Sequence, residues 1–262
     1  MRVRADRPRA KKSLGQHFLV DENFLGVIER LAELEPGDIV LEIGPGYGVL
    51  TRHLAERVET VHAIELDTSM RESLGEALQG TSNVHVTFAD AVRFEYGNLD
   101  PPPTKLVSNL PYNVATPIVV ESLERIPTLE RWVVMVQREV AERFFASPRT
   151  KAYGAVSVLV QLHTRKLGSH RVPSSAFRPK PRVESALVAF ERYPGTRLDL
   201  VRPVVESAFA HRRKTLANSL AHTGFASRSE AETALADIGR NAATRAEELA
   251  PEEFVALAKA LG

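Results

Sequence analysis

Through most of this chain, short apolar segments alternate with segments of helical periodicity, and few folds accommodate such an alternation. Apolar runs bounded by glycine, proline or acidic residues predict buried strands, and apolar residues spaced three and four apart predict helices. We expect strands at 38–44, 60–66, 83–88, 105–110 and 132–136. We expect helices at 21–34, 49–57, 69–78, 116–125 and 137–146. Strands joined through helices run parallel, so the sequence predicts an α/β fold with a mostly parallel sheet covered on both faces.

In the last third of the chain, the regular alternation of strand and helix patterns ends. Val172 and residues 183–190 are typical of later strands, whereas 154–164 fits a helix or a strand by pattern alone. After Pro194-Gly195 the patterns are helical to the end of the sequence, with no convincing strand. We therefore expect a basic arm at 1–20, an α/β domain at 21–194 and a small all-helical domain at 195–262.

The charge distribution indicates a polyanionic partner. The chain has 34 Lys and Arg against 33 Asp and Glu, yet residues 143–183 hold nine basic residues and no acidic one. A chain with near-equal numbers of both charges should rarely leave 41 consecutive residues without an acid. With the basic arm and His211-Arg212-Arg213-Lys214, this acid-free window predicts a nucleic-acid-binding surface. The alternative is that these basic residues lie on solvent-exposed faces and bind no nucleic acid.

The absence of cysteine and of long apolar runs excludes several classes of protein. Without cysteine there is no disulfide framework, no thiolate metal site and no cysteine nucleophile, which fits a reducing cytoplasm. No apolar run approaches the roughly 18 residues that would span a bilayer. The charged segment MRVRADRPRAKK lacks the apolar stretch of a signal peptide. We expect a cytoplasmic protein with no metal ion and no membrane partner.

A glycine-rich loop follows the first predicted strand. In EIGPGYG (42–48), Gly44 and Gly46 let the backbone turn tightly and approach a ligand with no side chain in the way. Glu65 ends the second strand, 21 residues after Gly44, where a carboxylate can accept hydrogen bonds from both hydroxyls of a ribose. Proteins that bind NAD and proteins that bind S-adenosylmethionine share both features, so these residues leave the cofactor open.

Asp90 adds a third ligand-binding position, at the end of the third strand. Its carboxylate can accept a hydrogen bond from an adenine amine, and open α/β sheets bind ligands at the carboxyl ends of their strands. The glycine loop departs from G-x-G-x-x-G and contains Pro45, which favours a methyl donor over a nicotinamide cofactor. A tight turn with incidental surface carboxylates is the alternative.

The segment NLPYN (109–113), at the end of the fourth strand, is the most specific signal. The exocyclic amine of adenine is a poor nucleophile because its lone pair is delocalised into the ring. Two acceptors on its N–H bonds would aim that lone pair at a methyl donor, and the side-chain oxygen of Asn109 and the backbone carbonyl of Leu110 or Pro111 can provide them. Pro111 stiffens the loop, and Tyr112 can stack on the base. Alignment of the two reactants would then supply most of the acceleration, without a strong general base.

A base inside a helix cannot reach such a pocket, so the target must be flipped out or already unpaired. Phe177 heads the proline-stiffened segment FRPKPRV (177–183), and its ring could close the other face of the base. A core phenylalanine is the alternative interpretation.

Taken together, these motifs resemble the rRNA adenine dimethyltransferase family. The similarity covers nearly the whole chain in one order. It is carried by KKSLGQHFLVD (11–21), EIGPGYGVLT (42–51), IELD (64–67), NLPYNVATP (109–117), KAYGAVSV (151–158), PSSAFRPKPRVESA (173–186) and AFAHRRKTLANSL (208–220). The resemblance implies a Rossmann-like class I methyltransferase with a seven-stranded, mostly parallel sheet and a small all-helical carboxyl-terminal domain.

The resemblance also implies a reaction and a partner. Members of the small-subunit branch transfer four methyl groups from S-adenosylmethionine to two adjacent adenosines, leaving S-adenosylhomocysteine. Those adenosines lie in the 3′-terminal hairpin loop of 16S rRNA within an immature 30S subunit. By the same resemblance the chain acts as a monomer, and its helical carboxyl-terminal domain docks on the ribosome.

Site residues follow from the resemblance position by position. The catalytic positions are Asn109, Leu110, Pro111, Tyr112 and Phe177. The cofactor-binding positions are His17, Leu19, Gly44, Gly46, Glu65, Asp90 and Asn109. The RNA-binding positions are Arg178, Lys180, Arg182, Arg212, Arg213 and Lys214. The family commonly has Asn at position 17, where this chain has His, and a backbone contact would survive that change.

Other functions compete with this interpretation. An NAD-dependent oxidoreductase would explain the glycine loop and Glu65, but it gives no role to NLPYN or to the acid-free window. An RNA-binding assembly factor with a vestigial site would explain the window, but the pocket motifs are intact. A sister branch of the family methylates a single adenosine of large-subunit rRNA. Pro117 and the HRRKT segment resemble the small-subunit branch more closely.

Overall fold

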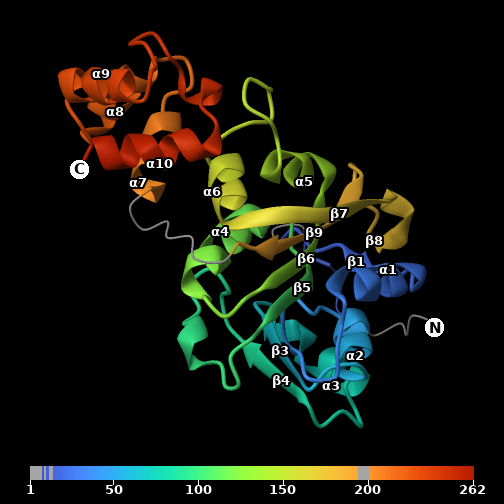
Figure 1. Ribbon diagram of the computed structural model, residues 1–262. Coiled ribbons are helices and arrows are strands. Elements are labelled where there is room, and N and C mark those ends of the chain that lie inside the picture. The colour runs from blue at the N-terminus through green and yellow to red at the C-terminus, as the bar shows by residue number, and fades with distance from the viewer. Residues whose placement is uncertain (1–7, 9, 12–13, 194–200) are drawn as a thin grey trace. The chain divides into compact units, whose positions relative to one another are not determined.

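A computed structural model describes residues 8, 10, 11, 14–193 and 201–262 (Figure 1). The chain divides into two compact units, each with its own core. The first unit comprises residues 1–141 and 166–192, and the second comprises 142–165 and 193–262. Most of the basic arm at 1–7, 9, 12 and 13, together with the expected boundary at Pro194-Gly195, lies outside the described residues.

A seven-stranded sheet forms the centre of the α/β fold, as the sequence predicts (Figure 1). Its strands are β2 (Ile39–Ile43), β3 (Thr60–Glu65), β4 (Val84–Phe88), β5 (Lys105–Asn109), β6 (Arg131–Gln137), β7 (Thr164–Val172) and β9 (Ser185–Arg192). Their order is β4-β3-β2-β5-β6-β9-β7. Strands β2 to β6 are parallel, and β9 joins β6 in the antiparallel direction. The expected mostly parallel, seven-stranded fold is confirmed.

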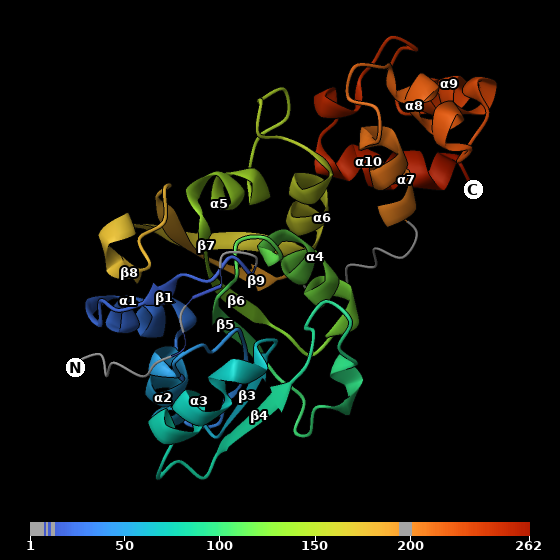
Figure 2. The same ribbon diagram turned by 180° about the vertical axis from the view of Figure 1, so that it is seen from behind.

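Helices cover the sheet, and three of them join consecutive parallel strands (Figure 2). They are α1 (Asn23–Ala32), α2 (Val49–Ala55), α3 (Arg71–Ala77), α4 (Ala115–Arg125) and α5 (Arg138–Phe144). Strands β2 and β3 are buried along their whole length, as expected for parallel strands with helices on both faces. A separate two-stranded ribbon pairs β1 (Phe18–Leu19) with β8 (Phe177–Arg178), which brings the amino-terminal segment to the proline-rich loop.

The parallel direction of β2 to β5 places four predicted residues at one edge of the sheet. Gly44, Glu65, Asp90 and Asn109 each stand at or just after the carboxyl end of one of these strands. Their strands are neighbours in the order β4-β3-β2-β5, so the four positions form a continuous row. The topology alone therefore assembles the candidate site.

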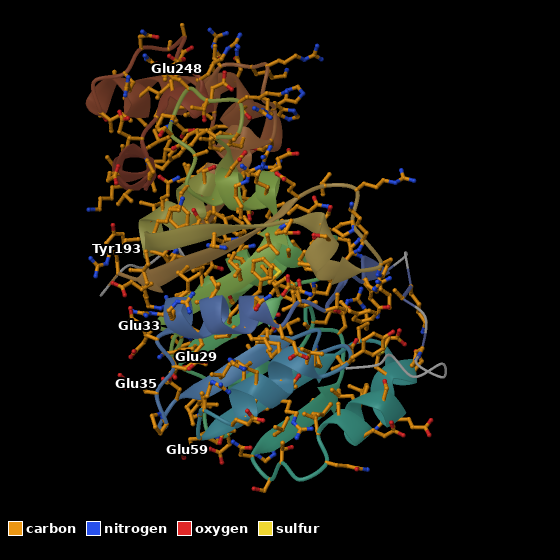
Figure 3. The ribbon with its side chains drawn as sticks, turned by 90° about the vertical axis from the view of Figure 1, so that its right-hand side faces the viewer. Glu29, Glu33, Glu35, Glu59, Tyr193 and Glu248 are labelled. Atoms are coloured by element: carbon orange, nitrogen blue, oxygen red, sulfur yellow. The ribbon has the colours of Figure 1, made fainter. Side chains whose placement is uncertain are left out.

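Acidic side chains mark the opposite end of the same strands. Glu29, Glu33, Glu35 and Glu59 lie on one side of the first unit (Figure 3). Glu35 and Glu59 shortly precede β2 and β3, so they stand at the amino ends of these strands. Glu35 and Glu59 therefore stand at the end of the sheet opposite to the edge that carries the glycine loop.

The second unit is helical but begins earlier in the sequence than expected. It contains α6 (Ala155–His163), α7 (Arg202–Phe209), α8 (Leu216–Thr223), α9 (Arg228–Asp237) and α10 (Pro251–Ala260). Residues 142–165, assigned to the α/β domain from the sequence, belong here. The buried Tyr153 explains why: its hydroxyl donates to the carbonyl of Leu249 at 2.8 Å, and its ring centroid lies 6.0 Å from that of Phe209. No helix of the described residues could span a membrane.

The acid-free window is accordingly divided between the two units. Its first part, to Arg165, belongs to the second unit, and the rest, which includes the proline-rich loop, belongs to the first. Several of its basic side chains are engaged in ion pairs, as Arg149 is with Glu248 and Arg171 is with Glu184. The window therefore does not belong to a single unit.

Removal of the Tyr153 hydroxyl tests this division of the chain. We expect Tyr153→Phe to lower the free energy of unfolding by about 1–3 kcal/mol, because the buried Leu249 carbonyl loses its donor. Chemical denaturation measures the loss. Tyr193→Phe is the matched control, since Tyr193 is 43% exposed and should change stability by less than about 0.5 kcal/mol. Equal stability of the two variants would contradict the assigned contact.

Candidate active site

A pocket opens at the edge of the sheet where β2 to β5 end. It encloses about 760 Å³, including open solvent at its mouth. Among its lining residues are the predicted positions Gly44, Gly46, Glu65, Asp90, Asn109, Leu110, Pro111, Tyr112 and His17. Nine of the eleven residues predicted as catalytic or cofactor-binding therefore line this pocket.

Two glycines of the loop after β2 adopt conformations that other residues disfavour. Gly44 and Gly46 have φ angles of +76° and +56°, in the left-handed region. A Cβ on Gly46 would lie 2.7 Å from the ring of Phe18, and a Cβ on Gly44 would lie 3.2 Å from Pro111. The loop is therefore packed closely against both the amino-terminal segment and the segment that follows β5.

Glu65 is held in a fixed orientation inside the pocket. Its side chain accepts hydrogen bonds from the backbone N–H of Gly46 at 3.1 Å and from that of Asp67 at 2.8 Å. Burial raises the pKa of the Glu65 carboxyl, while these amide donors oppose the shift. Each carboxylate oxygen keeps a further acceptor position, so the group can receive two hydroxyl donors from a ligand.

Asp90 stands at the more open side of the pocket. One carboxylate oxygen accepts a hydrogen bond from the backbone N–H of Val92 at 3.0 Å, and the residue is exposed. The neighbouring wall is apolar, and Leu66 in it is 54% exposed. A carboxylate beside an exposed apolar surface suits a flat heterocycle that carries an amine.

A polar cluster fastens the amino-terminal segment beside the pocket. The Nζ atom of Lys11 lies 2.6 Å from Asp67 Oδ1, and Gln16 Nε2 donates to Asp67 Oδ2 at 3.2 Å. Burial alone would raise the pKa of Asp67, but hydrogen bonds from Lys11, Ser69 and Gln16 lower it to about 2. The sequence showed these residues within recognisable motifs but gave no sign that they pair. They hold residues 14–18 along the pocket wall.

Asn109 presents its amide in a defined direction. Its Nδ2 donates to the backbone carbonyl of His17 at 2.8 Å. A carbonyl can only accept, so the NH₂ group of the amide faces His17 and the Oδ1 atom remains as an acceptor. No donor to this oxygen is found among the residues that the structure describes. The side chain thus carries the unused acceptor that the sequence interpretation requires.

The two backbone carbonyls proposed as the second acceptor differ in their surroundings. The Pro111 carbonyl accepts from the N–H of Val114 at 3.1 Å, closing a turn. Within the described part of the chain, no donor reaches the Leu110 carbonyl, while the Leu110 N–H donates to Met135 at 3.1 Å. The geometry therefore favours Leu110 over Pro111 for this role.

Tyr112 and His17 form a rigid pair of rings at the pocket. The Tyr112 hydroxyl makes a hydrogen bond with Ser185 Oγ, and the Tyr112 ring centroid lies 5.0 Å from that of His17. Burial raises the pKa of Tyr112, so this hydroxyl stays neutral. The Nδ1 atom of His17 lies 2.7 Å from the carbonyl of Pro179, which can only accept, so Nδ1 carries the proton.

Two sequence-predicted residues lie elsewhere. Phe177 is only 2% exposed and belongs to the hydrophobic core, so the expectation that it closes the face of a base is wrong for this structure. The reason is its place in β8, where it pairs with Leu19 of β1. Leu19 is also a core residue and lines only a small neighbouring pocket of about 310 Å³.

A second pocket adjoins the first on the side of the proline-rich loop. It encloses about 1020 Å³, again including open solvent, and shares Gly15, Gln16, His17 and Tyr112 with the first. Gln137 and residues 179–183 complete its lining. Arg178, Lys180 and Arg182 are exposed along this loop. In the described residues, no group of three or more His, Asp and Glu side chains could hold a metal ion.

The predicted basic cluster of the second unit is also exposed. Arg212, Arg213 and Lys214 lie in the turn between α7 and α8. One guanidinium nitrogen of Arg212 donates weakly, at 3.4 Å, to the carbonyl of Lys151. The three cations are therefore available to solvent.

Nearly the whole chain is similar in sequence to one family of known proteins. A family model described as Ribosomal RNA adenine dimethylase matches residues 7–261. Ribosomal RNA small subunit methyltransferase A of Rubrobacter xylanophilus is 49% identical over 252 residues, which cover 95% of this chain and 94% of that protein. The protein of the same name from Natranaerobius thermophilus is 40% identical over 275 residues, covering 95% and 90%.

Solved structures show the same fold. The 23S rRNA methyltransferase ErmE is 30% identical, with a TM-score of 0.67 over 93% of this chain and 99% of that one. A dimethyladenosine transferase from Plasmodium falciparum has a TM-score of 0.76 over 92% and 96%, at 24% identity. Both likenesses cover the second unit as well as the sheet.

Two substitutions at His17 test its contact with the proline-rich loop. An Asn side-chain nitrogen can occupy nearly the position of His Nδ1, whereas Ala removes the donor to Pro179. We expect His17→Ala to speed amide hydrogen exchange at Lys180, Arg182 and Val183 by roughly two- to tenfold, the worth of one hydrogen bond. His17→Asn should leave exchange near the native rate. Equal exchange in all three proteins would show that this contact does not hold the loop.

Proposed function

Because the chain belongs to the ribosomal RNA adenine dimethylase family, we propose that it methylates the exocyclic amines of two adjacent adenosines of 16S rRNA, using S-adenosylmethionine. The observation that carries this proposal is the oriented amide of Asn109, whose free Oδ1 stands at the edge of the candidate cofactor pocket. We further propose the 3′-terminal hairpin loop of an immature 30S subunit as the substrate. The protein would act as a cytoplasmic monomer.

The residues of the first pocket fit S-adenosylmethionine. Glu65 offers acceptor positions on both carboxylate oxygens, as a ribose diol requires. Asp90 and the exposed Leu66 offer an acceptor and an apolar surface for an adenine ring. The glycines at 44 and 46 let Phe18 and Pro111 pack directly against the loop backbone, which fixes the loop beside the pocket. Bound there, the cofactor would supply an electrophilic methyl group on a sulfonium that leaves as a neutral thioether.

Two acceptors of the chain prepare the nucleophile. Asn109 Oδ1 and the Leu110 carbonyl would each accept one N–H of the target amine, which draws the lone pair out of conjugation with the ring. Once the nitrogen forms its bond to the methyl carbon, its proton becomes acidic and leaves to water. No general base is needed, because alignment of the reactants supplies most of the acceleration.

Tyr112 would support the extruded base. Its ring is fixed by the bond to Ser185 and by contact with His17, so it loses little freedom when a base stacks on it. Stacking of a base on an aromatic side chain is worth roughly 1–3 kcal/mol and offsets part of the cost of unstacking the target. This contribution replaces the one expected of Phe177.

Two exposed basic clusters would contact rRNA phosphates. One is Arg178, Lys180 and Arg182 on the loop beside the second pocket, and the other is Arg212, Arg213 and Lys214 in the helical unit. Each cation that neutralises a phosphate releases a counterion, which makes binding salt-dependent. We propose the helical unit, with residues 142–165 included, as the ribosome-docking part of the chain.

Truncation of the Asn109 amide tests the catalytic proposal. We expect Asn109→Ala to reduce the rate of methyl transfer to unmethylated 30S particles by about 10²–10³, as for loss of a preorganised polar group. Radiolabelled transfer followed by nucleoside analysis measures the rate and identifies dimethyladenosine. Asn98→Ala, an exposed change in the same unit, is the control. Equal losses of transfer and of 30S binding would contradict the role given to Asn109.

Charge reversal tests the two basic clusters. We expect Arg212→Glu, Arg213→Glu and Lys214→Glu together to weaken 30S binding and to flatten the slope of log K against log salt by about 2. The same change at Lys180 and Arg182 should flatten it by about 1–2. Arg228→Glu is the control, since Arg228 is an exposed cation paired with Glu232. An unchanged slope would show that a cluster is only a solvated face.

A further inference from the structure

One residue that lines the second pocket, Gln137, has no role in the methyl transfer proposed above. Gln137 is the last residue of β6, the strand next to β5, and its backbone pairs with Ser185 of β9. Its side chain lines the second pocket and makes no hydrogen bond to any described residue. The half-buried amide can donate and accept at once, so an occupant that offers one donor and one acceptor side by side would satisfy it.

The other walls of this pocket suit a flat base attached to a phosphate chain. The His17 and Tyr112 rings are both tethered, at the Pro179 carbonyl and at Ser185. Fixed rings provide stacking surface at a low cost in conformational entropy. Lys180 and Arg182, which are also lining residues, are exposed cations that can neutralise a phosphate.

Adenine presents the pattern that a glutamine amide matches. Its 6-amine donates and its ring nitrogens accept, and Gln commonly makes two hydrogen bonds to this edge. Guanine carries two acceptors, O6 and N7, on the edge where adenine carries its 6-amine and N7, so that edge of guanine offers no donor to the Gln137 carbonyl. An occupant that presents this edge to Gln137 is therefore selected as adenine over guanine.

We propose that the second pocket binds the nucleotide adjacent to the base undergoing methylation and that Gln137 recognises it as adenosine. The two pockets share His17 and Tyr112, so a strand that places one base in the first has its neighbour at the second. This inference rests on the proposed function and adds to it a determinant of specificity for paired adenosines. Gln137 contacts substrate without touching the reacting atoms.

Substrates altered at one nucleotide test the assignment. Small subunits are reconstituted with rRNA in which either adenosine of the pair is replaced by purine riboside, which stacks but lacks the 6-amine. Single-turnover transfer of the first methyl group to the remaining adenosine is measured. We expect the native protein to react roughly tenfold or more slowly when the nucleotide in the second pocket lacks its amine.

Variants of Gln137 separate recognition from catalysis. Gln137→Leu should react with the normal pair and with the altered substrate at nearly the same, reduced rate, because it has no amide to lose. Its affinity for S-adenosylhomocysteine should match that of the native protein, which shows that the first pocket is intact. Gln79→Leu, an exposed change on the first unit, should retain the native discrimination.

The possible outcomes distinguish this inference from the proposed function. Equal native rates on the normal pair and both altered substrates would overturn the role of Gln137 while leaving the methylation itself established. Retained discrimination in Gln137→Leu would overturn it as well. Failure of the native protein to methylate the normal pair would overturn the proposed function, and with it this inference.

Discussion

The hydrogen bond from the Asn109 side chain to the His17 carbonyl determines what the edge of this sheet can do chemically. An amide that is free to turn would present its NH₂ group or its oxygen to a ligand. The His17 carbonyl accepts only the NH₂ group, so Oδ1 is left as the acceptor. The same bond joins the amino-terminal segment to the end of β5, two parts of the chain that are 92 residues apart. Preorganisation of one acceptor therefore depends on the position of the segment around His17.

His17 extends this dependence to the second pocket and the proline-rich loop. Its backbone orients Asn109, while its imidazole donates to Pro179 and packs against Tyr112. The Lys11 and Gln16 bonds to Asp67 hold the same segment from the other side. Gly15, Gln16 and His17 thus line both the first pocket, beside the loop after β5, and the second pocket, beside the proline-rich loop. A substitution in that segment should therefore alter the lining of both pockets.

Sequence patterns predicted the parts of the site that topology alone brings together. Glu65 and Asp90 were identifiable because each ends a parallel strand, and such ends always meet at one edge. Phe177 was not correctly placed, because its burial depends on the pairing of β1 with β8. Gln137 was not singled out, because its place in the second pocket depends on the proline-rich loop, which is distant in the sequence. Helical periodicity at 154–164 could not show that Tyr153 packs with later helices, since that contact spans 96 residues.

A crystal structure of the protein with S-adenosylhomocysteine tests the central claim most directly. Both ribose hydroxyls should donate to Glu65, and the thioether sulfur should face Asn109 Oδ1 across a gap that leaves room for a methyl group and an amine. The Asn109 amide should keep its bond to the His17 carbonyl. A sulfur directed away from Asn109, or an Asn109 amide turned so that its NH₂ group faces the sulfur, would contradict the catalytic arrangement described for this edge of the sheet.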